Sequence, residues 1–276
     1  MDFRSHLARP MDFRSPSNAI LGILTLITAG IAVYLWTSDR FEESANILLA
    51  PVHVFVIWAL AREIDPDHNW TALAAATATA VWALTGGPVA SALGLAGLMF
   101  AARIVTSTTG RRPLPVDLAF ASAFGIAIGF SVEGWVAGFG IALAIYRDDR
   151  FAEESRPMAV GASAVTAIGT TIVATLANAF PERLPDIDQG MVLAAGLAAL
   201  ALIAREPAAP ISQVDARHAA FIYKPRLYVS RAIVGILAFL MTLLTGADAI
   251  GMTVVVAAMV LVFVSNEIEL LRRPDL

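Results

Sequence analysis

The densest group of chemically capable side chains lies at residues 62–70, which read Arg-Glu-Ile-Asp-Pro-Asp-His-Asn-Trp. Carboxylate and imidazole ligands at such close spacing suit a hard divalent cation. We therefore predict a site for Mg²⁺ or another divalent cation, with ligands Glu63, Asp65, Asp67 and His68. Arginines that could contact a phosphate or lipid headgroup lie in the same segment and in a later loop, and are Arg62, Arg111 and Arg112.

The same segment also has a purely structural interpretation. An Asp-Pro pair is typical of a helix start, with Asp65 as the N-cap and Pro66 in the first helical position. Asp67 would then lie favourably near the positive end of the helix dipole. Capping explains these three residues without a ligand, so both interpretations stay open at this stage.

His53 is the second candidate, because it lies in the apolar run Ala-Pro-Val-His-Val-Phe-Val at 50–56. An ionisable side chain in such a run is costly and is a functional hypothesis by default. Imidazole can relay a proton, hydrogen-bond a substrate or ligate a metal, and we predict His53 as a substrate-binding residue. The alternative is a neutral imidazole bonded to a carbonyl of a neighbouring helix. Ten residues separate His53 from Glu63, about 15 Å along a helix, so the two candidates do not share one site.

Several other chemistries lack the residues they need. The chain has no cysteine, which excludes thiol nucleophiles, thiolate metal sites and redox pairs. It also has no phosphate-binding loop, no His-Glu-x-x-His and no Gly-x-Ser-x-Gly. The net charge of −4 gives no basis for binding nucleic acid. The charged run at 147–150, Arg-Asp-Asp-Arg, is expected to be a solvated and partly self-paired loop.

Composition indicates which elements must position these residues. Of the 276 residues, 58% are hydrophobic and only 15% are charged, whereas soluble domains carry about 25% charged residues. A soluble enzyme is therefore excluded. The composition predicts an all-α protein, a polytopic integral membrane helix bundle.

Ten apolar segments approach the length of a bilayer-spanning helix, which is about 20 residues. Turn-forming residues interrupt the longer runs at Gly86-Gly87-Pro88, at Val132-Glu133-Gly134 and at 245–248, and we predict tight hairpins there. The predicted spans are 19–36, 46–61, 70–85, 88–102, 117–132, 134–146, 158–179, 190–204, 232–246 and 249–265.

Charge asymmetry supports this count independently. With a cytoplasmic N-terminus, 17 of the 19 basic residues fall in inside segments and only Arg40 and Arg183 fall outside. We predict N- and C-termini inside a bacterial or archaeal cytoplasmic membrane, with tails at 1–18 and 269–276 and one bundle at 19–268. The motif Met-Asp-Phe-Arg-Ser occurs at residue 1 and again at residue 11, which indicates a short duplication or an alternative start.

Small residues indicate how the helices pack. Gly125-x-x-x-Gly129 and Gly134-x-x-x-Gly138 offer faces that allow close approach of backbones. We expect these faces to build a compact core, and they also suit homo- or hetero-oligomer contacts. The basic and aromatic loop at 205–231 is typical of a stretch lying against anionic lipid headgroups of the bilayer.

The bundle divides into possible halves, 19–132 and 134–265, with five predicted spans each, and an odd count would make them inverted repeats. This topology is similar to that of drug/metabolite permeases built from two inverted five-helix halves. We expect a permease-like inner-membrane protein that moves a small, weakly polar solute, since few charges lie in the spans. Two alternatives stay open: a membrane-embedded enzyme with a cytoplasmic-face cation and lipid-phosphate site, and a non-catalytic subunit or scaffold.

Overall fold

The computed structural model describes residues 11, 13–38, 44–66, 69–87, 90–107, 113–152, 155–182, 185, 189–204, 213–215, 220–221 and 224–245. These residues form nine α-helices: α1 (Pro16–Thr37), α2 (Ala50–Ile64), α3 (Asn69–Leu84), α4 (Ala92–Thr106), α5 (Pro115–Ala127), α6 (Val132–Arg150), α7 (Pro157–Leu176), α8 (Gln189–Ala204) and α9 (Lys224–Thr245). Two 3-10 helices adjoin them, η1 (Ser44–Leu49) before α2 and η2 (Ile128–Phe130) after α5. Two short antiparallel strands, β1 (Gln213–Asp215) and β2 (Ala220–Phe221), lie between α8 and α9.

Each of the nine helices overlaps one of the first nine predicted apolar segments, so the helical class of the fold is confirmed for the described residues. The predicted tenth span, 249–265, and the turn at 246–248 lie outside the described residues. The helix boundaries shift where proline fixes the start, because its ring presets a helical φ and its missing N–H costs nothing there. Thus α1 begins at Pro16 and α7 at Pro157.

Four helices are long and apolar enough to cross a membrane, namely Pro16–Thr37, Ile47–Ile64, Pro157–Leu176 and Lys224–Thr245. The second of these joins the end of η1 to α2. Shorter apolar helices run over Ala92–Thr106, Pro115–Phe130 and Val192–Ala204. The fold is therefore a helical bundle with several helices suited to a bilayer.

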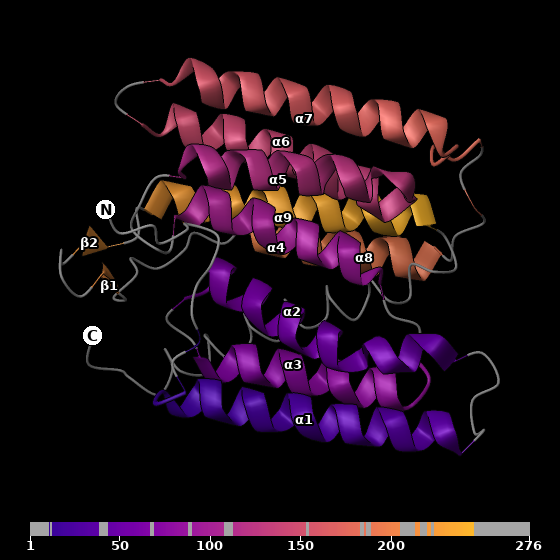
Figure 1. Cartoon of the computed structure of the whole chain (residues 1–276). Coiled ribbons are helices and arrows are strands. Elements are labelled where there is room, and N and C mark those ends of the chain that lie inside the picture. The colour runs from indigo at the N-terminus through magenta and orange to yellow at the C-terminus, as the bar shows by residue number, and fades with distance from the viewer. Residues whose placement is uncertain are drawn as a thin grey trace.

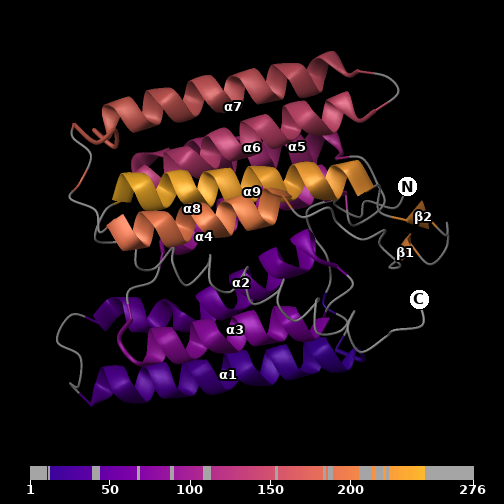
Figure 2. The ribbon, with the colours of Figure 1, turned by 180° about the vertical axis from the view of Figure 1, so that it is seen from behind.

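The helices lie side by side, and α1 and α7 occupy opposite edges of the bundle (Figure 1). Seen from behind, the same two helices still bound the assembly (Figure 2). Both carry large apolar side chains on the outside, including Leu26 on α1 and Leu176 on α7. A contiguous apolar surface of this kind is unfavourable in water and favourable in lipid.

The interior is built from small side chains. Alanines of α2, α3, α4 and α6 are fully or almost fully buried, and a hydrogen bond joins Thr170 Oγ1 of α7 to the carbonyl oxygen of Gly125 in α5. A Cβ at Gly138 of α6 would lie 2.6 Å from that same oxygen. The small-residue faces therefore bring helices of one chain into backbone contact, as expected of a compact core. Association of separate chains through such faces stays a prediction.

One predicted turn is present at the end of α3, although α3 packs on α1 and α2 while α4 packs on α2, α6 and α9, and another predicted turn is displaced. The α3 helix ends in a turn with Gly86 at φ 83°, a conformation that glycine adopts without strain. The second turn falls at Ser131 and not at 132–134, because Ser131 Oγ caps α6 by accepting a hydrogen bond from Gly134 N at 3.1 Å. Gly134 is needed inside the helix, since a Cβ there would overlap the carbonyl oxygen of Ile128.

Substitution of Gly138 by alanine tests the close helix contact. We expect Gly138→Ala to lower the free energy of unfolding by about 1–3 kcal/mol, because the added methyl group overpacks α6 against α5. The measurement is reversible unfolding in mixed micelles. Gly161→Ala in α7 is the matched control, since a Cβ there meets nothing within 4 Å. Equal stability of the two variants would contradict this packing.

Candidate functional site

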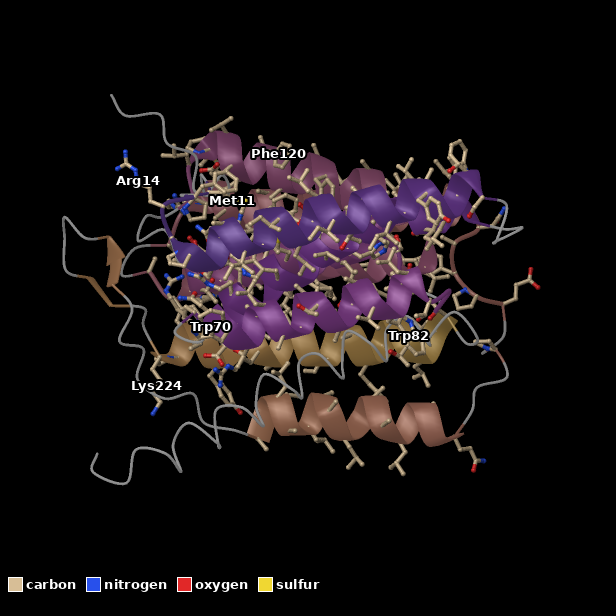
Figure 3. The ribbon with its side chains drawn as sticks, turned by 90° about the horizontal axis from the view of Figure 1, so that it is seen from below. Met11, Arg14, Trp70, Trp82, Phe120 and Lys224 are labelled. Atoms are coloured by element: carbon tan, nitrogen blue, oxygen red, sulfur yellow. The ribbon has the colours of Figure 1, made fainter. Side chains whose placement is uncertain are left out.

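Buried polar side chains gather at the two ends of the bundle. One end of the bundle is formed by the C-termini of α2, α4 and α6 and by the N-termini of α1, α7 and α9, and we call it the arginine end. All nine lysines and arginines that the structure describes lie at this end. Figure 3 shows Arg14, Trp70 and Lys224 at this end and Trp82 at the other, which we call the opposite end. The nine residues are Arg14, Arg62, Arg103, Arg147, Arg150, Arg156, Lys224, Arg226 and Arg231.

Glu63, the predicted ligand on α2, is paired within the protein. Its Oε1 accepts a hydrogen bond from Arg103 Nε at 2.7 Å, and its Oε2 accepts one from Thr106 Oγ1 at 3.2 Å. Only 1% of Glu63 is exposed. A buried carboxylate is stable only with its charge compensated, so this pair fastens the end of α2 to the end of α4.

Asp65 is not the N-cap of the next helix, so that part of the structural interpretation is wrong. Asp65 is the C-cap of α2, and α3 begins at Asn69. The physical reason is a tertiary contact with α9: Arg231 Nε donates to the carbonyl oxygen of Ile64 at 2.8 Å, and its Nη2 lies 3.9 Å from Asp65 Oδ1. The end of α2 is therefore fixed by a cation that the local sequence does not contain.

Residues 147–150 are not a solvated loop, which corrects a second expectation. They form the last turn of α6, with Asp148 2% and Asp149 1% exposed. Asp148 Oδ1 accepts a hydrogen bond from Arg226 Nη1 of α9 at 2.6 Å, and Asp149 Oδ1 accepts one from the backbone N–H of Arg156 at 2.8 Å. These contacts exclude water from both carboxylates and draw the starts of α7 and α9 onto α6.

Arg226 is the most widely shared cation of this network. Its Nη1 also donates to the carbonyl oxygen of Val105 at 3.0 Å and to Ser107 Oγ at 3.1 Å, both at the end of α4. Its guanidinium lies over the ring of Phe151, 5.0 Å from the centroid. One side chain of α9 therefore joins the ends of α4 and α6. Sequence reasoning took Arg226 as one of many loop cations, and no local motif distinguishes it.

The structure describes only some of the residues predicted to bind a metal or a phosphate. Glu63 and Asp65 lie near each other in sequence, but each faces an arginine. No group of three or more candidate ligands occurs among the residues that the structure describes. Asp67, His68, Arg111 and Arg112 lie outside those residues. The cation site and the phosphate contacts therefore stay predictions.

His53 lies in the first turn of α2, near the opposite end, and only 1% of it is exposed. Its Nδ1 is 2.8 Å from the carbonyl oxygen of Leu49, and its Nε2 is 2.7 Å from that of Ala90, just before α4. The contact with Ala90 agrees with the alternative in which the imidazole bonds a carbonyl of a neighbouring segment. Substrate binding by His53 stays a prediction.

Glu133 is a residue whose importance the sequence did not indicate, since it was taken as part of a turn. It lies in the first turn of α6 and is 9% exposed. Its Oε2 accepts a hydrogen bond from the backbone N–H of Ser91, the N-cap of α4, at 2.9 Å. Ser91 and Ser131, each three residues before a glycine, are serines of the type that caps helix starts. Glu133 follows Ser131 by two residues, and an acidic side chain in a first helical turn was the signal that could have indicated its role.

No known protein family, characterised protein or solved structure matches this chain. The function must therefore be inferred from the geometry of the two ends and of the helix that connects them.

The pair of Asp148 and Arg226 yields a stability prediction. We expect Asp148→Asn to cost about 3–5 kcal/mol of unfolding free energy, because it removes the carboxylate that compensates a nearly buried guanidinium. The double variant Asp148→Asn with Arg226→Gln should cost less than the sum of the two single variants. Unfolding in mixed micelles measures all three.

The exposed Arg150 at the end of the same helix provides the control. Arg150→Gln should change stability by about 0.5 kcal/mol or less, as for a surface substitution. An Asp148→Asn variant as stable as Arg150→Gln would contradict a structural role for the buried pair.

Proposed function

We propose that this chain is a permease-like integral membrane protein that moves a small, weakly polar solute. The observation that carries the proposal is the character of α2. It belongs to the most buried of the four candidate spans, with 67% of its apolar window buried against 17% for α1. It also carries polar groups along its whole length, which a helix used only for packing or for lipid contact does not need.

The polar groups of α2 lie at three levels. His53 is near the opposite end, Trp58 is midway and Glu63 is at the arginine end. Trp58 is 8% exposed, and its indole Nε1 has no hydrogen-bond partner among the described residues. A buried donor without an acceptor is costly, and a passing solute with a hydroxyl or carbonyl oxygen would supply one. This supports a path along α2 for a solute that is uncharged but able to accept hydrogen bonds.

The ion-pair network at the arginine end supports a gate. Arg231 meets Asp65, and Arg226 meets Val105 and Ser107, so cations from the predicted second half contact groups of the first half. Contacts of this kind can exchange between two arrangements when one half rocks against the other. We take the arginine end as the closed side of the path in this conformation.

We further propose ten spans in a bacterial or archaeal cytoplasmic membrane, with both termini and the arginine end on the cytoplasmic side. The collection of every described cation at one end supports this orientation by the positive-inside rule. Exposed aromatic and basic side chains at that end, such as Trp70, Tyr228 and Arg150, suit the headgroup region and anionic lipid.

Osmotic flux through proteoliposomes tests the transport proposal. Vesicles containing the purified protein are mixed with a gradient of glycerol, urea or erythritol, and the recovery of vesicle volume is followed by stopped-flow light scattering. We expect recovery several-fold faster than in protein-free vesicles of the same lipid for at least one of these solutes. Recovery at the protein-free rate for every solute, with helical circular dichroism intact, would contradict a permease.

Trp58→Phe tests the path along α2, because it removes the Nε1 donor and keeps an aromatic ring. We expect solute flux in this variant to fall several-fold. Trp82→Phe in α3, at the opposite end, is the matched control and should leave the flux unchanged. Equal flux in both variants would exclude the indole N–H of Trp58 from the path.

A further inference from the structure

The last turn of α6 carries two arginines that the buried ion-pair network does not use. In the segment Arg-Asp-Asp-Arg at 147–150, both aspartates are buried and contact Arg226 of α9 and the N-cap of α7. Arg147 and Arg150 are three residues apart, so they are neighbours on the helix surface, about 5–6 Å apart at Cβ. Arg150 is exposed and Arg147 is partly exposed. The segment therefore places its negative charges inside the bundle and its positive charges outside.

Aromatic rings hold both guanidinium groups at the end of α6. The Arg150 guanidinium lies over the ring of Tyr146, 5.1 Å from the centroid, and Arg150 Nε donates to the Tyr146 hydroxyl at 3.1 Å. The Arg147 guanidinium lies over the ring of Phe151, 5.8 Å from the centroid. Contact with a ring uses the face of a guanidinium and leaves the N–H groups of its edge for an acceptor. Among the residues that the structure describes, neither arginine contacts a carboxylate.

The N–H and O–H groups that remain match a phosphate. Guanidinium groups bind phosphate oxygens with paired, charge-assisted hydrogen bonds. Arg150 keeps both terminal nitrogens for such bonds, and Arg147 keeps its whole edge. The Tyr146 hydroxyl accepts from Arg150 and still has its own proton to donate. Two cations and one hydroxyl from a single turn of helix therefore suit one phosphate group.

The same face of α6 is apolar toward the middle of the bundle. Leu143 is 44% exposed, and Phe139 is partly exposed one turn further from the arginines. Positions 139, 143, 146 and 150 are spaced by three or four residues, so they share one side of the helix. This helix packs on α7 and α9, which lie on either side of it in Figure 2. Phe139 is seven residues before Tyr146, about 10 Å along the axis, which is within the half of a bilayer core of about 30 Å.

We propose that the end of α6 binds one anionic phospholipid. Its phosphate accepts hydrogen bonds from Arg147, Arg150 and Tyr146, and an acyl chain lies along Leu143 and Phe139. Charge complementarity selects this occupant, because two adjacent cations attract an anion and the face beside them attracts a hydrocarbon chain. A zwitterionic lipid carries an ammonium group that the same two cations repel. The lipid thus supplies outside the last turn of α6 the compensation that Arg226 supplies inside it.

The inference goes beyond the proposed transport function. It rests only on the part of that proposal which places the chain in a bilayer with the arginine end at the headgroup level. Binding of a lipid is measured without any transported solute, so a failure of this inference and a failure of the transport proposal are distinguishable.

Native mass spectrometry counts the lipids that the full-length protein retains. The purified protein in detergent micelles is titrated with phosphatidylglycerol, whose headgroup has one anionic phosphodiester, and separately with phosphatidylcholine of the same acyl chains. We expect the first phosphatidylglycerol to bind with an apparent Kd about tenfold or more below that of phosphatidylcholine, as for one added charge-assisted hydrogen bond.

The double variant Arg147→Gln with Arg150→Gln removes both cations of the site. We expect it to weaken phosphatidylglycerol binding about tenfold or more and to leave phosphatidylcholine binding unchanged. Arg14→Gln with Lys224→Gln is the matched control, since it removes the same two charges from the same end of the bundle (Figure 3) and should bind phosphatidylglycerol as the unmodified protein does. Tyr146→Phe keeps the ring and the net charge, and should weaken binding several-fold through loss of the hydroxyl.

Three results would overturn the proposal. Equal affinity for the two lipids would exclude a site for an anionic lipid. Equal losses in the two double variants would show a general attraction to the arginine end and not a site on α6. Displacement of phosphatidylglycerol by excess inorganic phosphate would show a site for free phosphate and not for a lipid. Helical circular dichroism of each variant checks that a loss of lipid is not a loss of fold.

Discussion

Buried charges at the arginine end determine how the helix ends meet, because each buried ion must be compensated within the protein. Asp148 and Arg226 satisfy this requirement for α6 and α9, and Arg226 extends it to α4 through backbone and hydroxyl oxygens. Glu63 and Arg103 do the same for α2 and α4. Apolar contacts between two helices tolerate several relative positions along the helix axis, whereas an ion pair requires one particular donor to meet one particular acceptor. They therefore set the relative position of four helices along the axis of the bundle.

Small side chains then determine how closely the same helices approach. Lipid chains and apolar side chains are equally apolar, so there is little hydrophobic drive for helix association in a bilayer. Dispersion attraction between closely packed backbones stabilises the association instead. It requires small residues such as Gly125 and Gly138, where an added methyl group would not fit. Packing of this kind fixes the centre of the bundle and leaves the polar groups of α2 enclosed between helices.

The two ends differ in the kind of polar contact they use. At the arginine end, cations and carboxylates pair directly, as Arg103 does with Glu63 and Arg226 with Asp148. At the opposite end, His53 and Glu133 contact the carbonyl oxygen and the N–H of one peptide group, the one between Ala90 and Ser91.

The sequence by itself determined the helical class and the location of nine helices, because apolar run length and turn residues are local properties. It also drew attention to His53 and Glu63, since ionisable side chains in or beside apolar runs are costly, and their roles in substrate and cation binding stay predictions. Only the tertiary structure decided what these residues contact. The arginine that meets Asp65 is Arg231, and the arginine that meets Asp148 is Arg226, at sequence separations that no local pattern encodes. The assignments of Asp65 as an N-cap and of residues 147–150 as a solvated loop failed for this physical reason: burial and pairing depend on which helix lies alongside, and that neighbour is specified by the packing of the whole chain.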